Sequence, residues 1–575
     1  MSTPTPTGPC DLLLTGGRIW TQDPGRPWAQ AVAVTGGRIS AVGDDAELRE
    51  LAGDRTRVVD LAGRFALPGL VDAHIHLNLG GAQARWEMPV APTATLDEVL
   101  EAVRSWAGGL GPGEWVVGGI LGSTVLARID ADPGALARLD EAAGGRPVLL
   151  RDDSMHNRWV SSAALAAMGV DADSPDPAGG RLVRTPDGAL NGLLHEMASS
   201  LAESAFAASV PDPAARTLGS LEAAVRVVNS FGITSVQDAA TTPAPVQALR
   251  TLEDQGRLSL RVVTSAPVRP FLEDSVVGDE LVAELRRHRS ELVRPDFVKV
   301  VLDGVPTTRT TALLTPYRCH HQHDTPEHGE LYWTPQDLRE QVEHCYDLGI
   351  GAKFHATGDA SARAVLDAVE AVRAERGPGP IFHVAHAEWV HPDDLPRFAA
   401  LDVVADASPY IWYPGVIPDA IAAEVPAELL DTMWPLRDLV AGGTVVAAGS
   451  DWPCALPTPD PWTGLETLVT RRNPDPAVPG ALNPGQALEL TDALTAFTSG
   501  AAAATGLADV AGRLVPGSSA DLIVLDRNLF EVPAEQIHAT TVLQTWFRGE
   551  LVHEAGTAPV PAPPLHREVV DAPAS

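Results

Sequence analysis

Paired cysteines, basic residues and long apolar runs are scarce in this 575-residue sequence. The four cysteines, Cys10, Cys319, Cys345 and Cys454, include no CxxC pair, which argues against a disulfide framework or a thiolate zinc site. Only 42 Lys and Arg stand against 75 Asp and Glu, so the formal net charge is −33 and an electrostatic grip on nucleic acid or on an anionic membrane is not expected. We therefore expect a small molecule or another subunit as the partner.

Membrane and secretion signals are also missing. No apolar run reaches the roughly 18 residues of a membrane span, and the first residues contain neither a basic n-region nor an apolar h-region. We therefore expect a cytoplasmic protein with no membrane partner. Apolar residues at 45% and charged residues at 20% are typical of a globular protein rather than a disordered or fibrous one.

Both ends of the sequence contain short β-branched runs separated by glycine turns, with no helical period. Because the two ends of a domain often lie close together in space, residues 10–66 and 505–556 are predicted to form one β-sandwich domain. The tail at 557–575 is rich in Pro and Ala and is expected to be a flexible arm.

Between these ends, helix-like and strand-like segments alternate, which is typical of a parallel α/β sheet. Candidate strands lie at 67–73, 233–238, 260–266, 296–302, 350–355, 380–386, 401–406 and 444–449. Eight strands with intervening helices predict an α/β fold of the (β/α)8 TIM barrel type over residues 67–504. The stretch 80–215 is too long for a loop in a compact barrel, so it is expected to be an inserted α/β subdomain.

The active site of such a barrel lies at the C-terminal ends of its strands. His74 and His76 end the first strand and, being two residues apart, can point to the same interior. Lys299 lies in an apolar run on the fourth strand, where a buried ammonium must be paired, neutral or modified. A carbamylated lysine bridging two metal ions would meet this requirement, and so would an ion pair with Asp303 or another carboxylate.

Three further strand ends contain metal-ligand side chains. His355 closes the fifth strand, His383 and His386 lie on the sixth, and Asp451 follows the last. Only one of His383 and His386 need be a ligand, and His386 is preferred because it is last on its strand. Five strand ends with imidazole, carboxylate or lysine on one rim indicate a metal site.

The motifs that contain these residues resemble, in order along the chain, those of the amidohydrolase superfamily of metal-dependent hydrolases: LPGLVDAHIHL, VKVVLDG, FHATGD, HVAHAE and GSDWP. The longer segments VKVVLDGVPTTRTTALLTPY and GSDWPC are similar to the YtcJ-like branch, which includes N-substituted formamide deformylases. The resemblance implies a barrel with a sandwich built from both chain ends, and possible homodimers. It also implies metal ligands at His74, His76, Lys299 (as a bridging carbamate), His355, His386 and Asp451.

These ligand types predict a hydrolytic mechanism with one or two divalent ions per chain, zinc before others. Such an ion lowers the pKa of bound water to about 7 and polarises a carbonyl, so a hydroxide is available at neutral pH. Asp451 would accept a proton from the attacking water and deliver it to the leaving nitrogen. We therefore predict an enzyme that hydrolyses an amide-type C–N bond other than a peptide bond, in a formamide or another N-acyl amine.

Two alternatives stay open from the sequence. The same metal site could act on an ester, a lactone or a cyclic amide, because barrel loops change specificity without changing the metal core. A metal-stabilised binding protein without catalysis is the more remote alternative, and the proposed proton shuttle at Asp451 argues against it, since a purely structural site would not need one.

Two side chains outside the metal motifs are candidate substrate contacts. His156, in the inserted region, is expected to contact the substrate, to act as an extra electrophile beside the metal, or to lie in a surface turn. Arg309, in the loop after Lys299, could bind a substrate carboxylate or carbonyl, although an Arg in an acidic protein also forms salt bridges.

Overall fold

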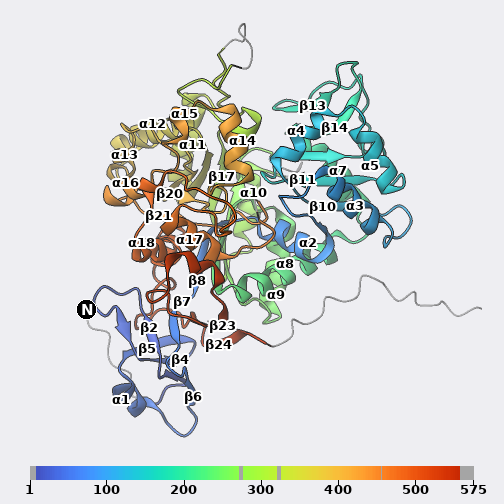
Figure 1. Ribbon diagram of the computed structural model, residues 1–575. Coiled ribbons are helices and arrows are strands. Elements are labelled where there is room, and N and C mark those ends of the chain that lie inside the picture. The colour runs from blue at the N-terminus through green and yellow to red at the C-terminus, as the bar shows by residue number, and fades with distance from the viewer. Residues whose placement is uncertain (1–7, 271–275, 320–325, 455, 557–575) are drawn as a thin grey trace, which may run out of the picture.

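The computed structural model describes residues 8–270, 276–319, 326–454 and 456–556. The predicted flexible arm at 557–575 lies outside them. At the centre, eight parallel strands form one sheet in the order β21-β20-β19-β18-β17-β16-β15-β8 (Figure 1). The strands are β8 (Leu70–Ile75), β15 (Ile233–Asp238), β16 (Arg261–Pro267), β17 (Val293–Val301), β18 (Gly351–Ala356), β19 (Phe382–His386), β20 (Val403–Ala407) and β21 (Val446–Ala448).

The first and last strands in this order, β21 and β8, are joined by a hydrogen bond just after β21. The backbone N–H of Asp451, just after β21, donates to the carbonyl oxygen of His74 on β8 at 2.7 Å. The sheet is thereby nearly closed, which confirms the predicted barrel. Its strands are buried along almost their whole length, as expected for a parallel sheet covered on its outer side by helices.

The helices that cover the barrel begin and end at the signals present in the sequence. In α11 (Pro335–Leu348), the Thr334 hydroxyl accepts from the N–H of Asp337 at 3.1 Å, and Gly349 ends the helix with a left-handed φ of 62°. The other principal covering helices are α8 (Pro213–Ser230), α9 (Pro243–Asp254), α10 (Gly278–Arg286), α12 (Asp359–Arg376), α13 (Leu395–Ala400) and α16 (Leu436–Ala441). Each connects one barrel strand to the next and buries an apolar side on the sheet.

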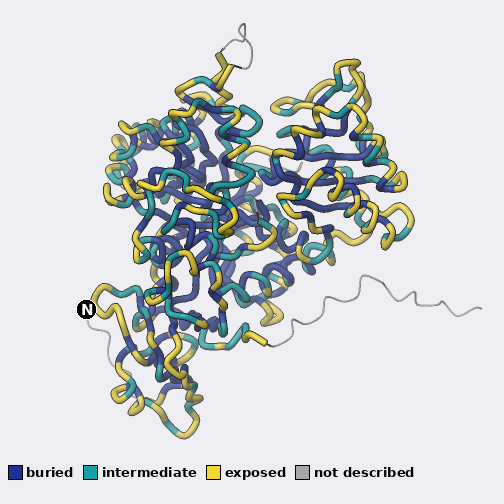
Figure 2. The backbone as a smooth tube through the Cα atoms, viewed as in Figure 1, coloured by how far each residue is buried: buried dark blue, intermediate teal, exposed yellow. Residues whose placement is uncertain are grey.

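A second sheet interrupts the barrel after its first strand and lies to one side of it (Figure 1). Its order is β13-β14-β12-β11-β10-β9, with β9 (Met88–Pro89), β10 (Val116–Leu121), β11 (Val148–Asp152), β12 (Asn157–Val160), β13 (Gly180–Arg184) and β14 (Leu190–Glu196). The helices α3 (Leu96–Ala107), α5 (Ala135–Ala143), α6 (Ser162–Met168) and α7 (Ser199–Ser209) pack on it. Many residues inside this unit are buried (Figure 2). Apolar side chains of the unit form cores of its own, distinct from the barrel core.

Two further sheets lie beneath the barrel, and together they draw on both ends of the chain (Figure 1). One has the order β5-β4-β1-β6, with β1 (Leu12–Thr15), β4 (Ala31–Thr35), β5 (Arg38–Gly43) and β6 (Arg57–Asp60). The other has the order β24-β23-β22-β7-β2-β3, with β2 (Arg18–Trp20), β3 (Trp28–Ala29), β7 (Phe65–Pro68), β22 (Leu522–Leu525), β23 (Val542–Phe547) and β24 (Glu550–Glu554). Apolar side chains of both sheets form a shared core, while the limits 10–66 and 505–556 stay a prediction.

None of the helices in the described ranges combines the length and the apolar character needed to cross a bilayer.

Candidate metal centre and substrate pocket

A pocket opens at the C-terminal ends of the barrel strands, where the inserted subdomain faces the barrel. Strand ends and the loops after them contribute one side, with His74, His76, Lys299, His355, His386 and Asp451 among the lining residues. The subdomain contributes the other side through Ser123, Asp153, Ser154, Met155 and His156. The structure therefore brings all six sequence-predicted metal ligands to one cavity.

The tightest group of ligand atoms in this pocket belongs to His74, His76 and Asp451, whose donor atoms lie within 4.8 Å of one another. Oδ1 of Asp451 lies 3.6 Å from Nε2 of His74 and 3.4 Å from Nε2 of His76. This oxygen is buried and has no hydrogen-bond partner among the described residues. Imidazole nitrogens and a carboxylate oxygen are ligands that zinc prefers, so the donor set fits a divalent metal ion.

The backbone at two of these strand ends adopts a conformation that side chains usually avoid. His386 has a φ of 72° and Asp451 a φ of 55°, both in the left-handed region. Such a conformation costs about 1–2 kcal/mol for a residue with a Cβ, and strained positions of this kind cluster at functional sites. At both positions, the turn directs the side chain into the pocket.

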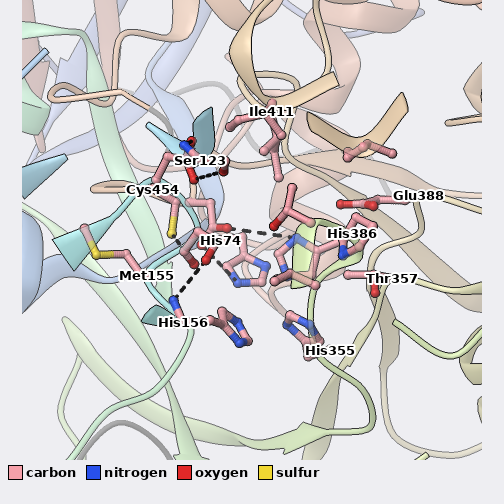
Figure 3. A pocket seen from close by; sticks show the side chains of 18 of the residues that line it. His74, Ser123, Met155, His156, His355, Thr357, His386, Glu388, Ile411 and Cys454 are labelled. Atoms are coloured by element: carbon pink, nitrogen blue, oxygen red, sulfur yellow. Dashed lines mark hydrogen bonds and ion pairs between the residues drawn. The ribbon is translucent and has the colours of Figure 1, made fainter. Parts of the chain in front are cut away.

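The remaining imidazoles continue the group across the pocket. The ring of His386 lies 4.9 Å from that of His74 and 4.6 Å from that of His355, and Figure 3 shows these rings facing one space. Burial lowers the pKa of His74 and His355 well below the usual range and that of His386 to about 4. The three rings are therefore neutral, which is the form in which imidazole binds a metal.

Lys299 and Asp451 are the charged groups beside these rings. Nζ of Lys299 lies 3.5 Å from Nε2 of His74, and burial, together with the nearby Lys353, lowers the pKa of Lys299 to about 8. Burial disfavours the ionised form of Asp451, but His74, His386 and His76 hold the pKa of its carboxyl below the usual range. Asp451 is therefore a carboxylate at neutral pH.

The choice between the two histidines of β19 follows from the direction of their side chains. Nε2 of His383 lies 2.9 Å from the carbonyl oxygen of Ala504, and Nδ1 lies 3.2 Å from Nζ of Lys353. His383 is fully buried and does not line the pocket, whereas His386 does. Residues three apart on a strand face opposite sides, so the geometry supports His386 as the ligand candidate.

Two buried residues that the sequence analysis did not single out lie behind His74. Oδ2 of Asp406 lies 3.1 Å from Nδ1 of His74 and also pairs with the ammonium of Lys353. Lys353 donates in addition to the carbonyl oxygen of Ala73 at 2.9 Å. A carboxylate on the far nitrogen fixes the ring orientation and tautomer of a metal-binding histidine, so Asp406 directs Nε2 of His74 into the pocket.

Asp303, considered from the sequence as a partner for Lys299, has a different set of partners. Its carboxylate accepts from the N–H of Ala312 at 3.0 Å, the N–H groups of Thr357 and Gly358 at 3.1 Å, and the hydroxyl of Ser361 at 2.8 Å. These bonds hold the loop after β17 against the segment after β18. Asp303 therefore fixes the position of the loop after β17, which lies beside His355.

His156 lies in the pocket wall rather than in a surface turn. Antiparallel pairing of β12 and β14 aligns Asn157 with His195, which places His156 opposite Glu196. Nδ1 of His156 lies 2.7 Å from Oε2 of Glu196, and the hydroxyl of Thr310 donates to Oε1 of Glu196 at 2.8 Å. The ring of His156 lies 5.3 Å from that of His355, so the subdomain places an oriented imidazole beside the ligand candidates.

Arg309 does not line the pocket. Its Nε donates to Glu327 at 2.9 Å, and Nη1 donates to Glu424 at 2.9 Å. The guanidinium is thus occupied by salt bridges, which the sequence analysis named as the other possibility. The structure gives no support for a contact between Arg309 and the substrate.

Comparison with known proteins agrees with the fold. The sequence pattern described as the amidohydrolase family matches residues 57–553. The chain belongs to the amidohydrolase family. This confirms the resemblance found in the sequence motifs, and together with the donor set it supports a metal-dependent hydrolase.

Among its relatives, this amidohydrolase is 29% identical to N-substituted formamide deformylase of Arthrobacter pascens, over 95% of this chain and 98% of the relative. It is 25% identical to the putative amidohydrolase YtcJ of Bacillus subtilis (strain 168), over 94% of this chain and 98% of the relative. An uncharacterized metal-dependent hydrolase from Pyrococcus horikoshii OT3 shares the fold, with a TM-score of 0.70, 22% identity and coverage of 91% of this chain and 99% of that structure.

Proposed function

We propose that this amidohydrolase cleaves the C–N bond of a small N-acyl amine, with formamides as the first substrates to examine. The observation that carries the proposal is the buried Oδ1 of Asp451, which lies between Nε2 of His74 and Nε2 of His76 with no hydrogen-bond partner among the described residues. The similarity to N-substituted formamide deformylase of Arthrobacter pascens supports the choice of substrate.

His74, His76 and Asp451 would hold one metal ion. Lys299, as a carbamate, would bridge it to a second ion held with His355 and His386. Zinc suits this set of imidazole and carboxylate ligands. When bound, such an ion polarises a carbonyl and lowers the pKa of water to about 7.

Asp451 supplies the proton transfers. Hydrolysis joins the oxygen of water to the carbonyl carbon and breaks the C–N bond, and a proton must move from that water to the departing nitrogen. A carboxylate of Asp451 accepts the proton first and then gives it to the nitrogen, as a general base and then a general acid. Its place in the pocket lining, beside the imidazoles of His74 and His76, supports this role.

The rest of the pocket binds the substrate. His156, oriented by Glu196, offers a hydrogen bond to the carbonyl oxygen, while Ile411, Ile417 and Ile421 form an apolar surface for the substituent on nitrogen. A pocket that is mainly apolar with a few directed polar groups is typical of a small-molecule site.

The experiment measures metal content and hydrolysis on the same preparation. Protein expressed with zinc and bicarbonate is assayed for release of amine from a panel of formamides and acetamides, before and after removal of metal by a chelator. We expect turnover that disappears on chelation and returns with zinc, and close to two ions per chain. Lys299→Ala should lower the metal content.

Other results would change the proposal. Full metal occupancy without hydrolysis of any amide in the panel would contradict it. About one ion per chain, unchanged in Lys299→Ala, would contradict the bridging carbamate and leave a mononuclear site.

A further inference from the structure

Glu388 is a buried acidic residue in the pocket that the proposed mechanism leaves unused. It follows β19 by two residues, and its backbone is fixed because its carbonyl oxygen accepts from the N–H of Trp434 at 2.7 Å. The residue is only 4% exposed, and its carboxyl group lines the pocket (Figure 3).

The carboxyl group of Glu388 has no partner in the described part of the chain. Its Oε2 is buried without a hydrogen bond, and no described side chain or backbone group forms a hydrogen bond or ion pair with either oxygen. Burial, together with the nearby carboxylates of Asp303 and Asp451, raises the pKa of this carboxyl well above its usual range. Buried polar groups are nearly always hydrogen-bonded, and leaving one unsatisfied is costly, so the exception calls for a ligand.

The surroundings of Glu388 indicate which ligand would satisfy it. Ile411, Ile417 and Ile421 line the same cavity and offer no hydrogen-bond donor from their side chains. Although other residues that line the cavity offer donors, none of them bonds to Oε2 of Glu388 among the described residues. A carboxyl oxygen accepts hydrogen bonds, so a molecule that fills the cavity can satisfy it with a donor of its own. A nitrogen compound with an apolar substituent has both features.

We propose that Glu388 is a specificity-determining residue that accepts a hydrogen bond from an N–H group of the substrate, while the apolar part of the substrate packs on the three isoleucines. This inference rests on the proposed hydrolysis of N-acyl amines and names the substrates that the pocket selects. The N–H group can come from two sources, the amide that is cleaved or a protonated amine on the substituent.

Two matched pairs of compounds distinguish the sources. N-butylformamide and N-butyl-N-methylformamide differ by the amide N–H. N-(4-aminobutyl)formamide and N-pentylformamide differ by a terminal ammonium in place of a methyl group. For the zinc-loaded protein, kcat/KM is measured for each compound, and the Kd of each is measured separately by calorimetry.

Two variants make the comparison specific. Glu388→Gln keeps an oxygen that accepts from an amide N–H but removes the carboxyl group that would form an ion pair with an ammonium. Glu388→Met removes the acceptor and keeps a side chain of similar length. Because it also removes an unsatisfied buried group, Glu388→Met should melt no lower than the wild-type protein, so a loss of preference could not be ascribed to unfolding.

If the amide is the source, the wild-type protein prefers the secondary over the tertiary formamide by about tenfold or more. This preference persists in Glu388→Gln and falls to near one in Glu388→Met. If an ammonium is the source, the preference for the aminobutyl compound is lost in both variants. Either pattern supports the role of Glu388.

Preferences that are the same in the wild-type protein and in Glu388→Met would overturn the assignment while leaving the hydrolysis intact. Binding that depends on Glu388 without any turnover would refute the proposed function and leave the assignment standing. If none of the compounds is bound or hydrolysed, both are overturned.

Discussion

The two sides of the pocket are built differently. On the barrel side, six candidate ligands lie at strand ends, and buried partners such as Asp406 and Asp303 fix their surroundings. On the subdomain side, His156 and its neighbours lie in turns at the edge of a separate sheet that has its own core. The barrel side can hold reacting groups rigidly, so we assign the metal and the proton transfers to it, together with the selection of the substituent by Glu388 and the three isoleucines. To the subdomain side we assign the contact of His156 with the substrate carbonyl.

The largest effect is expected from Asp451 on the barrel side. Asp451→Asn keeps an oxygen near His74 and His76 but removes the proton acceptor, so kcat should fall by about 10³-fold or more. Metal content, measured by elemental analysis on the same protein, should remain largely unchanged. Turnover within about tenfold of wild type would show that another group moves the proton.

The subdomain contains a buried ion network formed by Glu203, Arg151 and Arg158. Glu203 accepts from Nε of Arg151 at 2.8 Å and from Nε of Arg158 at 2.6 Å. Although burial opposes ionisation, these two guanidinium groups lower the pKa of Glu203 to about 2. A carboxyl with a depressed pKa contributes stability above its ordinary pKa near 4.5 and loses it as the pH falls toward 2.

Glu203→Gln should therefore lower the free energy of unfolding at pH 7 on the order of 3 kcal/mol, and the difference from wild type should shrink below pH 4.5. Urea unfolding at pH 7 and at pH 3 measures both values. Glu101→Gln is the control, because its ion pair with Arg104 is exposed and such pairs contribute little. A difference that is equal at both pH values would mean that the network acts through packing alone.

Metal affinity should depend on the residue behind His74. Asp406→Asn weakens the hydrogen bond between residue 406 and Nδ1 of His74, which orients the His74 ring. Zinc affinity, measured in competition with a chelator, should therefore fall by about 10–100-fold. The variant also leaves the ammonium of Lys353 without its carboxylate, so Lys353→Met combined with Asp406→Asn separates orientation of His74 from an unpaired buried charge.

Asp393→Asn is the matched control for this measurement, because Asp393 pairs with His391 at an exposed position. It should bind zinc as the wild-type protein does. Unchanged zinc affinity in both Asp406 variants would refute the orienting role of Asp406.

On the subdomain side, His156→Gln should lower kcat/KM by about tenfold, the value of one hydrogen bond to substrate, with metal content unchanged. Glu196→Gln should have a similar but smaller effect, because it weakens the contact that orients Nδ1 of His156. Loss of zinc in His156→Gln would assign this residue to the metal centre and would break the division between the two sides.

The barrel side was accessible from the sequence because the candidate ligands end an apolar run or, for Lys299, lie within one, which assigns each of them to a barrel strand. Asp406 and Lys353 could have been found by the argument applied to Lys299, since each is a charged residue within a predicted strand. The contact between His156 and Glu196 could not, because it depends on the antiparallel register of β12 and β14. The sequence also could not predict that Oε2 of Glu388 is buried without a hydrogen-bond partner among the described residues, because this depends on which side chains surround it in the fold.

The smallest effect is expected at Arg309, the candidate that the structure places outside the pocket. Arg309→Gln removes two ion pairs at a partly exposed position, with Glu327 and Glu424, and such pairs contribute little. We expect kcat/KM within about threefold of wild type for neutral and for carboxylate-bearing formamides alike. A KM that rises only for the carboxylate-bearing compounds would show that the guanidinium leaves its glutamates to meet the substrate, and the loop after β17 would then take part in substrate binding.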